Sequence, residues 1–252
     1  MGDILITELL EKFKKSDNRL ILLDYDGTLV DYEVIPQKAI LSDDLGGILM
    51  TLINKPQTHV LIISGRGHTD IDKLVDHLPI NIIAEHGAMM KTGGVWRDQA
   101  TKEATWKREV ITIFNQLTSV CPGSYIEEKK FSLTWHYRNA ESQAGYTCSR
   151  ELISKLVNII QSWGLKILDG NKVVEIMALE IGKGKAVKKL LEKEKYDFVL
   201  SIGDDTTDEE IFELLLPDEN AFTIKVGNGN TYAKGRLSSV SDVALFLKQL
   251  AE

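Results

Sequence analysis

The sequence is poor in cysteine and proline, and it has no long apolar run. Its two cysteines, Cys121 and Cys148, lie far apart and form no CxxC pair, which argues against a zinc site or a disulfide framework and predicts a reducing, cytoplasmic environment. The longest apolar runs, such as residues 20–23 and 60–63, have the length of strands and are far too short to span a membrane. With five prolines and 43% hydrophobic residues, the composition is that of a folded globular chain.

Positive charge is also scarce, because 30 Lys and Arg residues stand against 37 Asp and Glu residues and leave a net charge of −7. A protein that binds nucleic acid broadly needs a basic face that neutralises phosphates. We therefore expect no nucleic-acid partner and no membrane partner, and an anionic ligand would have to be held by local cations. We expect the chain to act as a monomer on a small molecule.

Strand and helix alternate at both ends of the chain, which is the pattern of parallel strands joined by helical crossovers. The predicted elements of the first third are strands at 20–24, 59–64 and 81–84 and helices at 39–53 and 69–78. Those of the last third are helices at 183–195 and 208–216 and strands at 198–202 and 221–226. The fold class that we expect is α/β, with both ends in one doubly wound, mostly parallel sheet.

The middle of the chain has a different pattern. Residues 124–128 and 131–137 have the pattern of adjacent strands joined by a short charged turn, which predicts antiparallel pairing. The other predicted elements of this region are helices at 103–120 and around 152–160 and strands at 165–168 and 173–177. We expect an inserted α+β cap domain over residues 89–177, interrupting a core made of residues 1–88 and 178–252.

The first motif is an apolar strand that ends abruptly in Asp24, Tyr25, Asp26, Gly27 and Thr28. Carboxylates at the carboxyl end of a buried parallel strand lie where α/β sheets bind ligands. Asp24 and Asp26 can face one cavity, one as nucleophile or metal ligand and the other as acid or base. A plain Asp-Gly turn after a strand is the alternative without function.

The second motif is the strand at 59–64, which ends in Ser64, Gly65 and Arg66. A hydroxyl and free backbone N–H groups at a strand end can bind a phosphoryl oxygen, and glycine permits close approach. Taken alone, the same residues are equally typical of the start of an ordinary loop.

The third motif places Gly203, Asp204, Asp205 and Asp208 after the strand at 198–202. Several carboxylates on one loop repel one another unless a hard cation joins them, and oxygen ligands suit Mg²⁺. The alternative is a helix start, with Thr206 or Thr207 as the N-cap and the acids favoured by the helix dipole. Both interpretations can hold together.

The fourth motif is Lys183, at the start of a predicted helix after the insertion. A lysine there can neutralise a phosphoryl group and a nucleophilic carboxylate together. An ordinary surface lysine is the alternative, because Lys185, Lys188 and Lys189 follow closely.

In this order, DYDGT, Ser64, Lys183 and GDDTTD resemble the motifs of the haloacid dehalogenase superfamily of aspartate-nucleophile phosphatases. The resemblance implies that Asp24 attacks phosphorus to form an aspartyl-phosphate and that Asp26 protonates the leaving oxygen and then activates water. The catalytic residues that it implies are Asp24, Asp26, Ser64 and Lys183. The Mg²⁺ ligands that it implies are Asp24, Asp204 and the backbone carbonyl of Asp26, with Asp205 and Asp208 just outside them. Gly65 and Arg66 are expected to bind substrate.

Substrate choice is expected to come from the cap, where the strand at 131–137 alternates between an apolar and a polar side. Glu127 and Lys129 share a side if the preceding strand continues, and sugar hydroxyls need such acceptors and donors. The alternative is a solvated turn, because residues 127–130 form a charge run.

The segment YIEEKKFSLTWHYR, together with AEHGA, VVEI and GDDTTDEEIF, resembles the trehalose-6-phosphate phosphatase family over nearly the whole chain. The resemblance implies trehalose 6-phosphate as the substrate, with Glu127, Lys129 and Glu175 binding the disaccharide and Arg138 on the phosphate side. The chain departs from the family pattern at Met177, Ala178 and Gly182, where the family usually has Arg, Pro and Asn.

Two alternatives remain open. Another sugar-phosphate phosphatase, for example one that acts on sucrose phosphate, would share the core residues and differ only in the cap. A non-catalytic regulatory module is disfavoured, because Asp24, Asp26, Ser64, Lys183 and Asp204 are all present.

Overall fold

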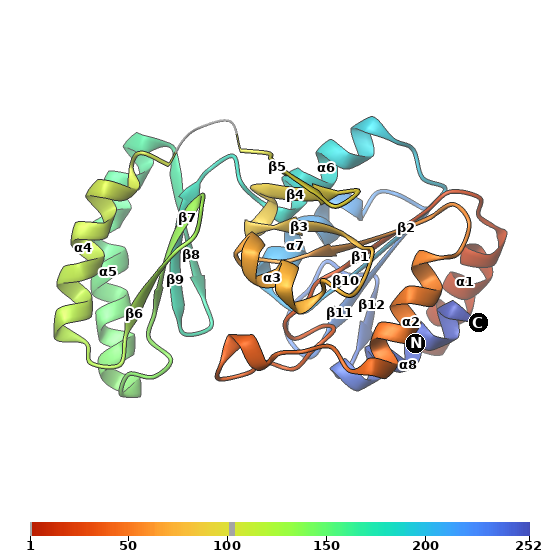
Figure 1. Ribbon diagram of the computed structural model, residues 1–252, viewed down its shortest axis with the longest axis horizontal. Helices are drawn as coiled ribbons and strands as arrows, with labels where there is room; N and C mark the ends of the chain where they lie inside the picture. The colour runs from red at the N-terminus through yellow and green to blue at the C-terminus, as the bar shows by residue number, and fades with distance from the viewer. Residues whose placement is uncertain (1, 101–103) are drawn as a thin grey trace. The chain divides into compact units, whose positions relative to one another are not determined.

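The computed structural model describes residues 2–100 and 104–252, which divide into two compact units. The core unit extends to Gln99 and resumes from Gly182 to Glu252, and the inserted unit runs from Ala100 to Ile181 (Figure 1). Across the described ranges, no helix combines the length and the apolar character that crossing a bilayer requires.

The core unit is built on a mostly parallel sheet. In the part of the chain that the structure describes, this sheet has eight strands in the order β12-β11-β10-β1-β2-β3-β4-β5. Its strands are β1 Arg19–Leu23, β2 Thr58–Ile63, β3 Asn81–Ala84, β4 Met89–Thr92, β5 Val95–Asp98, β10 Phe198–Gly203, β11 Ala221–Val226 and β12 Gly235–Leu237. The central strands β1 and β10 are almost wholly apolar and buried, as strands covered on both faces must be. The predicted doubly wound, mostly parallel sheet is confirmed.

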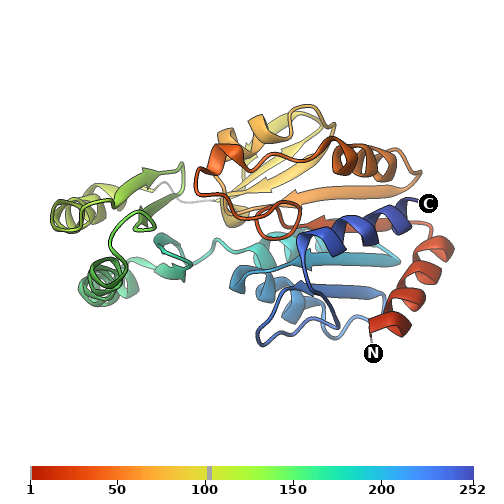
Figure 2. The ribbon, with the colours of Figure 1, turned by 90° about the horizontal axis from the view of Figure 1, so that it is seen from below.

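Helices cover both faces of this sheet. They are α1 Gly2–Lys15, α2 Asp43–Ile53, α3 His68–Leu74, α6 Lys183–Lys193, α7 Thr206–Leu215 and α8 Val240–Ala251, with short 3₁₀ turns η1 Pro36–Lys38 and η2 Glu85–Gly87. Val187 of α6 and Ile211 of α7 pack against Leu20 and Leu22 of β1. Figure 2 shows α8 running along the strands, with α1 beside the C-terminal end of α8.

Helix α2 begins later than the pattern predicts. The helix was expected over 39–53, but the Ser42 hydroxyl accepts a hydrogen bond from the Leu45 N–H at 3.3 Å and so caps a helix that starts at Asp43. The residues before it form the η1 turn and a loop.

The division between the two units also differs from the predicted one. Residues 89–98, expected in the cap, form the hairpin β4–β5, which joins the core sheet through antiparallel pairs such as Ile83 with Met90. The two-residue turn Gly93–Gly94, with φ values of 57° and 79°, closes the hairpin. At the other end, β9 continues to Ala178 inside the inserted unit, and the core resumes at Gly182.

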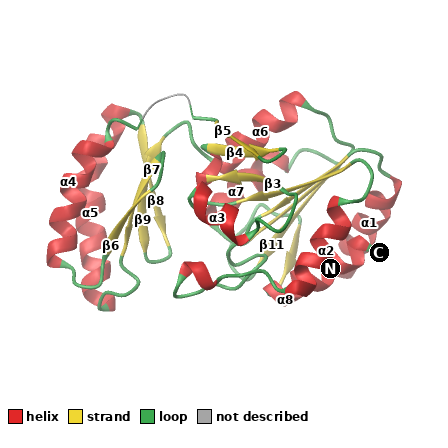
Figure 3. Ribbon diagram, in the orientation of Figure 1, coloured by secondary structure: helices red, strands yellow, loops and turns green. Residues whose placement is uncertain are grey.

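The inserted unit is an antiparallel sheet with two helices on one face (Figure 3). Its elements are α4 Lys107–Val120, β6 Tyr125–Glu128, β7 Ser132–His136, α5 Ser142–Trp163, β8 Leu165–Gly170 and β9 Val173–Ala178, and the strand order is β6-β7-β9-β8. The predicted start of the first helix at residue 103 lies outside the described residues. Leu133 and Trp135 of β7 pack against Phe114 of α4 and Leu156 of α5. The α+β character predicted for the insertion is therefore confirmed, with an apolar face on the helices and a polar face opposite.

Candidate active site

The predicted site residues of the core unit gather at the carboxyl ends of three neighbouring strands. In the register of the sheet, Leu23 of β1 pairs with Ile202 of β10 on one side and Ile62 of β2 on the other. The residues that follow these strands therefore leave the sheet at the same edge. Asp24 follows β1, Ser64 follows β2 and Asp204 follows β10.

A buried ion-pair triad lies at the centre of this edge. Lys183, the first residue of α6, places its Nζ 2.7 Å from Asp24 Oδ1 and 2.8 Å from Asp208 Oδ1. The three residues are 2%, 5% and 1% exposed, respectively. Burial lowers the pKa of the Lys183 ammonium, but Asp208 and Asp24 outweigh it and raise this pKa above its usual value. Lys183 is thus a buried, charged partner of Asp24 rather than a surface lysine.

Asp24 carries a strongly perturbed carboxyl group. Burial, helped by the negative charge of Asp208, raises the pKa of Asp24 well above its usual value, and Lys183 only partly opposes this. The second oxygen, Oδ2, accepts a long hydrogen bond from Thr28 Oγ1 at 3.3 Å. An extra cation near Asp24 would therefore stabilise its ionised form.

Asp204 has one oxygen engaged and one open. The Tyr32 hydroxyl donates a hydrogen bond to Asp204 Oδ2 at 2.9 Å. Asp204 Oδ1 is buried and accepts no hydrogen bond from the described residues. Burial raises the pKa of Asp204 to about 6; the Tyr32 hydroxyl opposes the rise and Asp208 adds to it.

The acidic cluster fits a divalent cation. Ligand oxygens of Asp24, Asp204 and Asp208 lie within 4.8 Å of one another. Both oxygens of Asp208 are already used, because Oδ1 binds Lys183 and Oδ2 accepts the N–H groups of Asp204 and Asp205 at 3.2 and 3.1 Å. Two oxygens remain for a cation: Asp204 Oδ1, and Asp24 Oδ2 with its one long hydrogen bond from Thr28. Carboxylate oxygens are ligands that Mg²⁺ prefers.

The acidic loop at the start of α7 caps the helix and also carries Asp204 of the acidic cluster. Asp205 and Asp208 form a capping box, and Asp205 Oδ1 accepts the Thr206 N–H at 2.6 Å. The prediction that Thr206 or Thr207 would be the N-cap is wrong, since a carboxylate one residue earlier reaches the free N–H groups. Asp205 and Asp208 therefore hold the loop that carries Asp204.

Asp26 and Arg66 are paired with each other. The guanidinium Nε and Nη2 each donate a hydrogen bond of 2.6 Å to the two oxygens of the Asp26 carboxylate. Nη1 donates a third to the Pro36 carbonyl at 2.9 Å. The sequence predicts a separate role for each residue, an acid/base and a substrate contact, and does not predict this bidentate pair.

The loop after β2 is held by backbone hydrogen bonds. Ser64 is 1% exposed, and its hydroxyl accepts the Arg66 N–H at 3.1 Å. The His86 N–H donates to the Ser64 carbonyl at 3.1 Å, and the His86 ring lies directly against Gly65. Glu85 and His86 both adopt left-handed backbone, with φ of 50° and 55°. The sequence motifs give no sign of this contact between His86 and Gly65.

In the inserted unit, three predicted sugar-binding residues share the polar face of the sheet. Lys129 Nζ lies 3.0 Å from Glu175 Oε1, which also accepts the Ser132 hydroxyl at 2.5 Å. Glu127 Oε2 lies 2.7 Å from His136 Nε2. Burial acts to raise the pKa of Glu127, but the hydrogen bond with His136 lowers it overall.

The alternative of a solvated turn fails for Lys129, because its side chain is 7% exposed and that of Glu175 is 4% exposed. His136 of β7 joins this group as the partner of Glu127. Arg138 makes a different contact, because its Nη2 donates to the Asn171 carbonyl at 3.0 Å in the β8–β9 turn.

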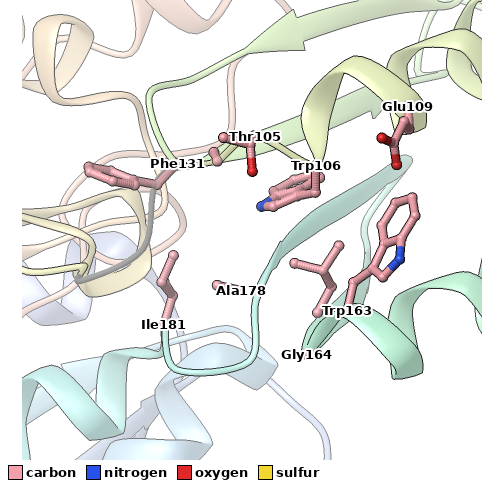
Figure 4. A pocket seen from close by; sticks show the side chains of 10 residues that line it. Thr105, Trp106, Glu109, Phe131, Trp163, Gly164, Ala178 and Ile181 are labelled. Atoms are coloured by element: carbon pink, nitrogen blue, oxygen red, sulfur yellow. The ribbon is translucent and has the colours of Figure 1, made fainter.

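The inserted unit also contains an aromatic pocket of about 370 Å³. Figure 4 shows Trp106, Phe131, Trp163 and Ile181 around it. Glu127, Lys129, Arg138 and Glu175 are not among its lining residues. The pocket and the polar face are therefore different parts of this unit.

One departure from the expected family pattern has a local reason. A Cβ on Gly182 would lie 2.4 Å from Glu210 Oε2, so the carboxylate of α7 fills the space beside this residue. The same Oε2 accepts the Gly184 N–H at 3.3 Å. Met177 and Ala178 are the last residues of β9, and Met177 is buried.

Comparison with known proteins gives one consistent family. The family model described as Trehalose-phosphatase matches residues 22–241. A bifunctional trehalose-6-phosphate synthase/phosphatase of Thermoproteus tenax is 39% identical over 251 residues, covering 99% of this chain and 34% of that protein. A trehalose-phosphatase of Saccharomyces cerevisiae is 36% identical over 231 residues, covering 82% and 26%. The chain spans about a third of the length, or less, of these curated relatives.

Comparison with solved structures gives the same family. The C-terminal domain of a trehalose-6-phosphate phosphatase from C. albicans superimposes with a TM-score of 0.91 at 31% identity, covering 98% of this chain and 96% of that chain. A haloacid dehalogenase-like hydrolase from B. subtilis, at 15% identity and a TM-score of 0.61, shows the fold alone. The family model covers most of the chain, with the motif residues from Asp24 to Asp208 inside the matched range. This chain belongs to the trehalose-phosphatase family.

Proposed function

We propose that the chain hydrolyses trehalose 6-phosphate to trehalose and phosphate through an aspartyl-phosphate on Asp24. The observation that carries the proposal is the buried Asp24, held 2.7 Å from Lys183 at the carboxyl edge of the sheet, in a chain of this family. A buried carboxylate beside a fixed ammonium is placed to attack the phosphorus of a phosphate group, because the ammonium offsets the repulsion between the two anions.

In the first step, an oxygen of Asp24 bonds to phosphorus and the bond from phosphorus to the sugar oxygen breaks. Lys183 offsets negative charge on both groups, and Ser64 and the backbone of Gly65 hold the phosphoryl oxygens. Asp26 gives a proton to the leaving sugar oxygen. In the second step, Asp26 takes a proton from the water that attacks phosphorus and releases Asp24.

Arg66 limits when Asp26 can donate a proton. Its guanidinium holds both oxygens of Asp26 as hydrogen-bond acceptors. Asp26 must leave this pair before it can donate a proton, and Arg66 is then free to bind the phosphate. The pair and the predicted separate roles thus belong to successive stages of one reaction.

Mg²⁺ is the proposed cofactor, held by Asp24, Asp204 and the backbone carbonyl of Asp26. The open Oδ1 of Asp204 and the raised pKa of Asp24 support this, because both indicate missing positive charge. When bound, the ion offsets negative charge on the transferring phosphoryl group. Asp205 and Asp208 fix the loop from just outside the ligands.

The sugar is proposed to be recognised by Glu127, Lys129 and Glu175, with Arg138 on the phosphate side. The first three support this by lying together on one polar sheet face with their charged groups held in fixed positions. Fixed donors and acceptors discriminate between sugars because a wrong hydroxyl pattern leaves them unpaired.

We also propose a monomer in the cytoplasm. The low cysteine content supports a reducing compartment. Size-exclusion chromatography with light scattering would test the monomer, and a dimer mass would contradict it.

Phosphate release from a panel of sugar phosphates, with Mg²⁺ and with excess chelator, tests the whole assignment. We expect trehalose 6-phosphate to be the best substrate and chelation to abolish turnover reversibly. Preference for sucrose phosphate would favour the alternative substrate. Full activity in excess chelator would contradict the proposed Mg²⁺ requirement.

A further inference from the structure

Tyr32 lies beside the proposed metal site but in none of its sequence motifs. It follows the Asp-Gly turn of the first motif, in the loop between β1 and η1. Its hydroxyl donates the hydrogen bond to Asp204 Oδ2 at 2.9 Å. The other oxygen of the same carboxylate is the buried one that accepts no hydrogen bond from the described residues.

The approach of Tyr32 to Asp204 depends on Gly27. This glycine has a φ of 78°, and a Cβ on it would lie 2.2 Å from Asp204 Oδ2 and 2.7 Å from Tyr32 Cε2. The Gly27 N–H also donates to the Val30 carbonyl at 2.7 Å, which closes the loop that leads to Tyr32. The turn, the ring and the carboxylate therefore pack as one group.

We propose that Tyr32 is a positioning residue of the metal site. By holding Asp204 Oδ2, its hydroxyl fixes the rotation of the carboxylate and leaves Oδ1 available to a divalent cation shared with Asp24. Hydrogen-bonded partners of a ligating carboxylate set metal affinity in this way. A neutral phenol suits the task, because a lysine or arginine there would compete with the cation.

This inference rests on the metal part of the proposed function and is independent of the sugar. The competing explanation is that the ring merely covers the site, since Tyr32 is 50% exposed. Tyr32→Phe separates the two, because it removes the hydroxyl and keeps the ring, whereas Tyr32→Ala removes both.

The test is Mg²⁺ binding by isothermal titration calorimetry without substrate. We expect Tyr32→Phe to weaken Mg²⁺ binding by about tenfold or more, the usual cost of losing such a partner. The rise in Tm that Mg²⁺ produces in the parent protein should shrink accordingly, while Tm in chelator stays the same. On an aryl phosphate, the Mg²⁺ concentration for half-maximal activity should rise.

Tyr146→Phe is the matched control. Tyr146 is 54% exposed, lies on α5 in the inserted unit and contacts Arg150 through its ring, which phenylalanine keeps. It should bind Mg²⁺ as the parent protein does. Parent-like Mg²⁺ affinity in Tyr32→Phe would overturn the proposal, whether or not Tyr32→Ala binds more weakly. If the sugar panel fails but this titration succeeds, only the substrate assignment falls.

Discussion

Arg66 holds Asp26 through two parallel hydrogen bonds of 2.6 Å, so the residue proposed to deliver a proton is placed as a pure acceptor. The third donor of the guanidinium ties it to the Pro36 carbonyl. This pair links the first and second motifs. Productive chemistry requires that the link be exchanged for contacts with the substrate.

The first prediction tests proton transfer by Asp26. Asp26→Asn keeps the backbone carbonyl but cannot shuttle a proton, so turnover of trehalose 6-phosphate should fall by about 10²- to 10⁴-fold. An aryl phosphate has a leaving group of low pKa that needs less protonation, so its loss in the first step should be smaller. Steady-state phosphate release on both substrates checks this, and equal losses would argue against the acid role.

The second prediction concerns the nucleophile. Asp24→Asn should lower kcat by at least about 10⁴-fold, as when a catalytic unit loses its nucleophile. Since burial raises the pKa of Asp24, the charged form is disfavoured in the fold, and the neutral amide should keep or raise Tm in chelator. Circular dichroism melts and phosphate release measure both effects. A well-folded variant with substantial turnover would contradict the assignment.

The third prediction tests sugar recognition with Glu127→Ala. A hydrogen bond to a charged group contributes about 1.5 to 3 kcal/mol, so kcat/KM on trehalose 6-phosphate should fall roughly ten- to a hundredfold. Activity on a small aryl phosphate should barely change, because the core residues are untouched. Equal losses on both substrates would indicate a structural role for Glu127. No loss on either substrate would show that Glu127 does not bind the sugar.

The fourth prediction uses the buried pair in the inserted unit. Glu175→Ala removes a carboxylate that lies 3.0 Å from the Lys129 ammonium, whose side chain is 7% exposed, and should lower Tm markedly. The double variant Glu175→Ala with Lys129→Met removes both charges and should recover part of this loss. Thermal melts of the two single variants and the double one measure the coupling, and strictly additive changes would contradict it.

The fifth prediction concerns pH. The pKa of Asp204 is raised to about 6, and that of Asp24 is raised as well, so the folded protein binds these protons more tightly than the unfolded chain. The stability that these groups contribute without metal therefore increases as pH falls from above 6 toward 4. Mg²⁺ binding requires the deprotonated oxygens and should weaken over the same range. Calorimetric titrations at pH 7.5 and 5.5 should show weaker Mg²⁺ binding at the lower pH, and unchanged affinity would contradict this.

The sequence was sufficient for the sheet and for the edge where the motifs meet. Apolar strands that end in Asp24, Ser64 and Asp204 dictate both, because parallel strands bring their carboxyl ends together. The hairpin at 89–98 could have been found from its Gly-Gly turn, but nothing local tells which sheet a hairpin joins. Its pairing with β3 is a tertiary contact.

The partnerships inside the site were beyond a motif-based interpretation. Tyr32 reaches Asp204 only because the loop after β1 turns back at Gly27. His136 contacts Glu127 because β6 and β7 are paired in a register that places them on the same face. Arg66 follows β2 and binds Asp26, which follows the neighbouring strand β1. Such contacts depend on where long side chains end, and neither spacing nor periodicity specifies that.

The position of the inserted unit along the chain has a consequence for synthesis. Strands β1 to β5 are made before the inserted unit, but β10, which pairs with β1, follows only after the whole inserted unit has been made. The inserted unit is continuous in sequence, so it can fold as soon as it emerges, whereas β1 keeps an open edge. An unpaired apolar edge is a template for aggregation. A nascent chain stalled before β10 would therefore expose one edge of β1, and Asp24 would lack Asp204 beside it until β10 and the loop after it have been made.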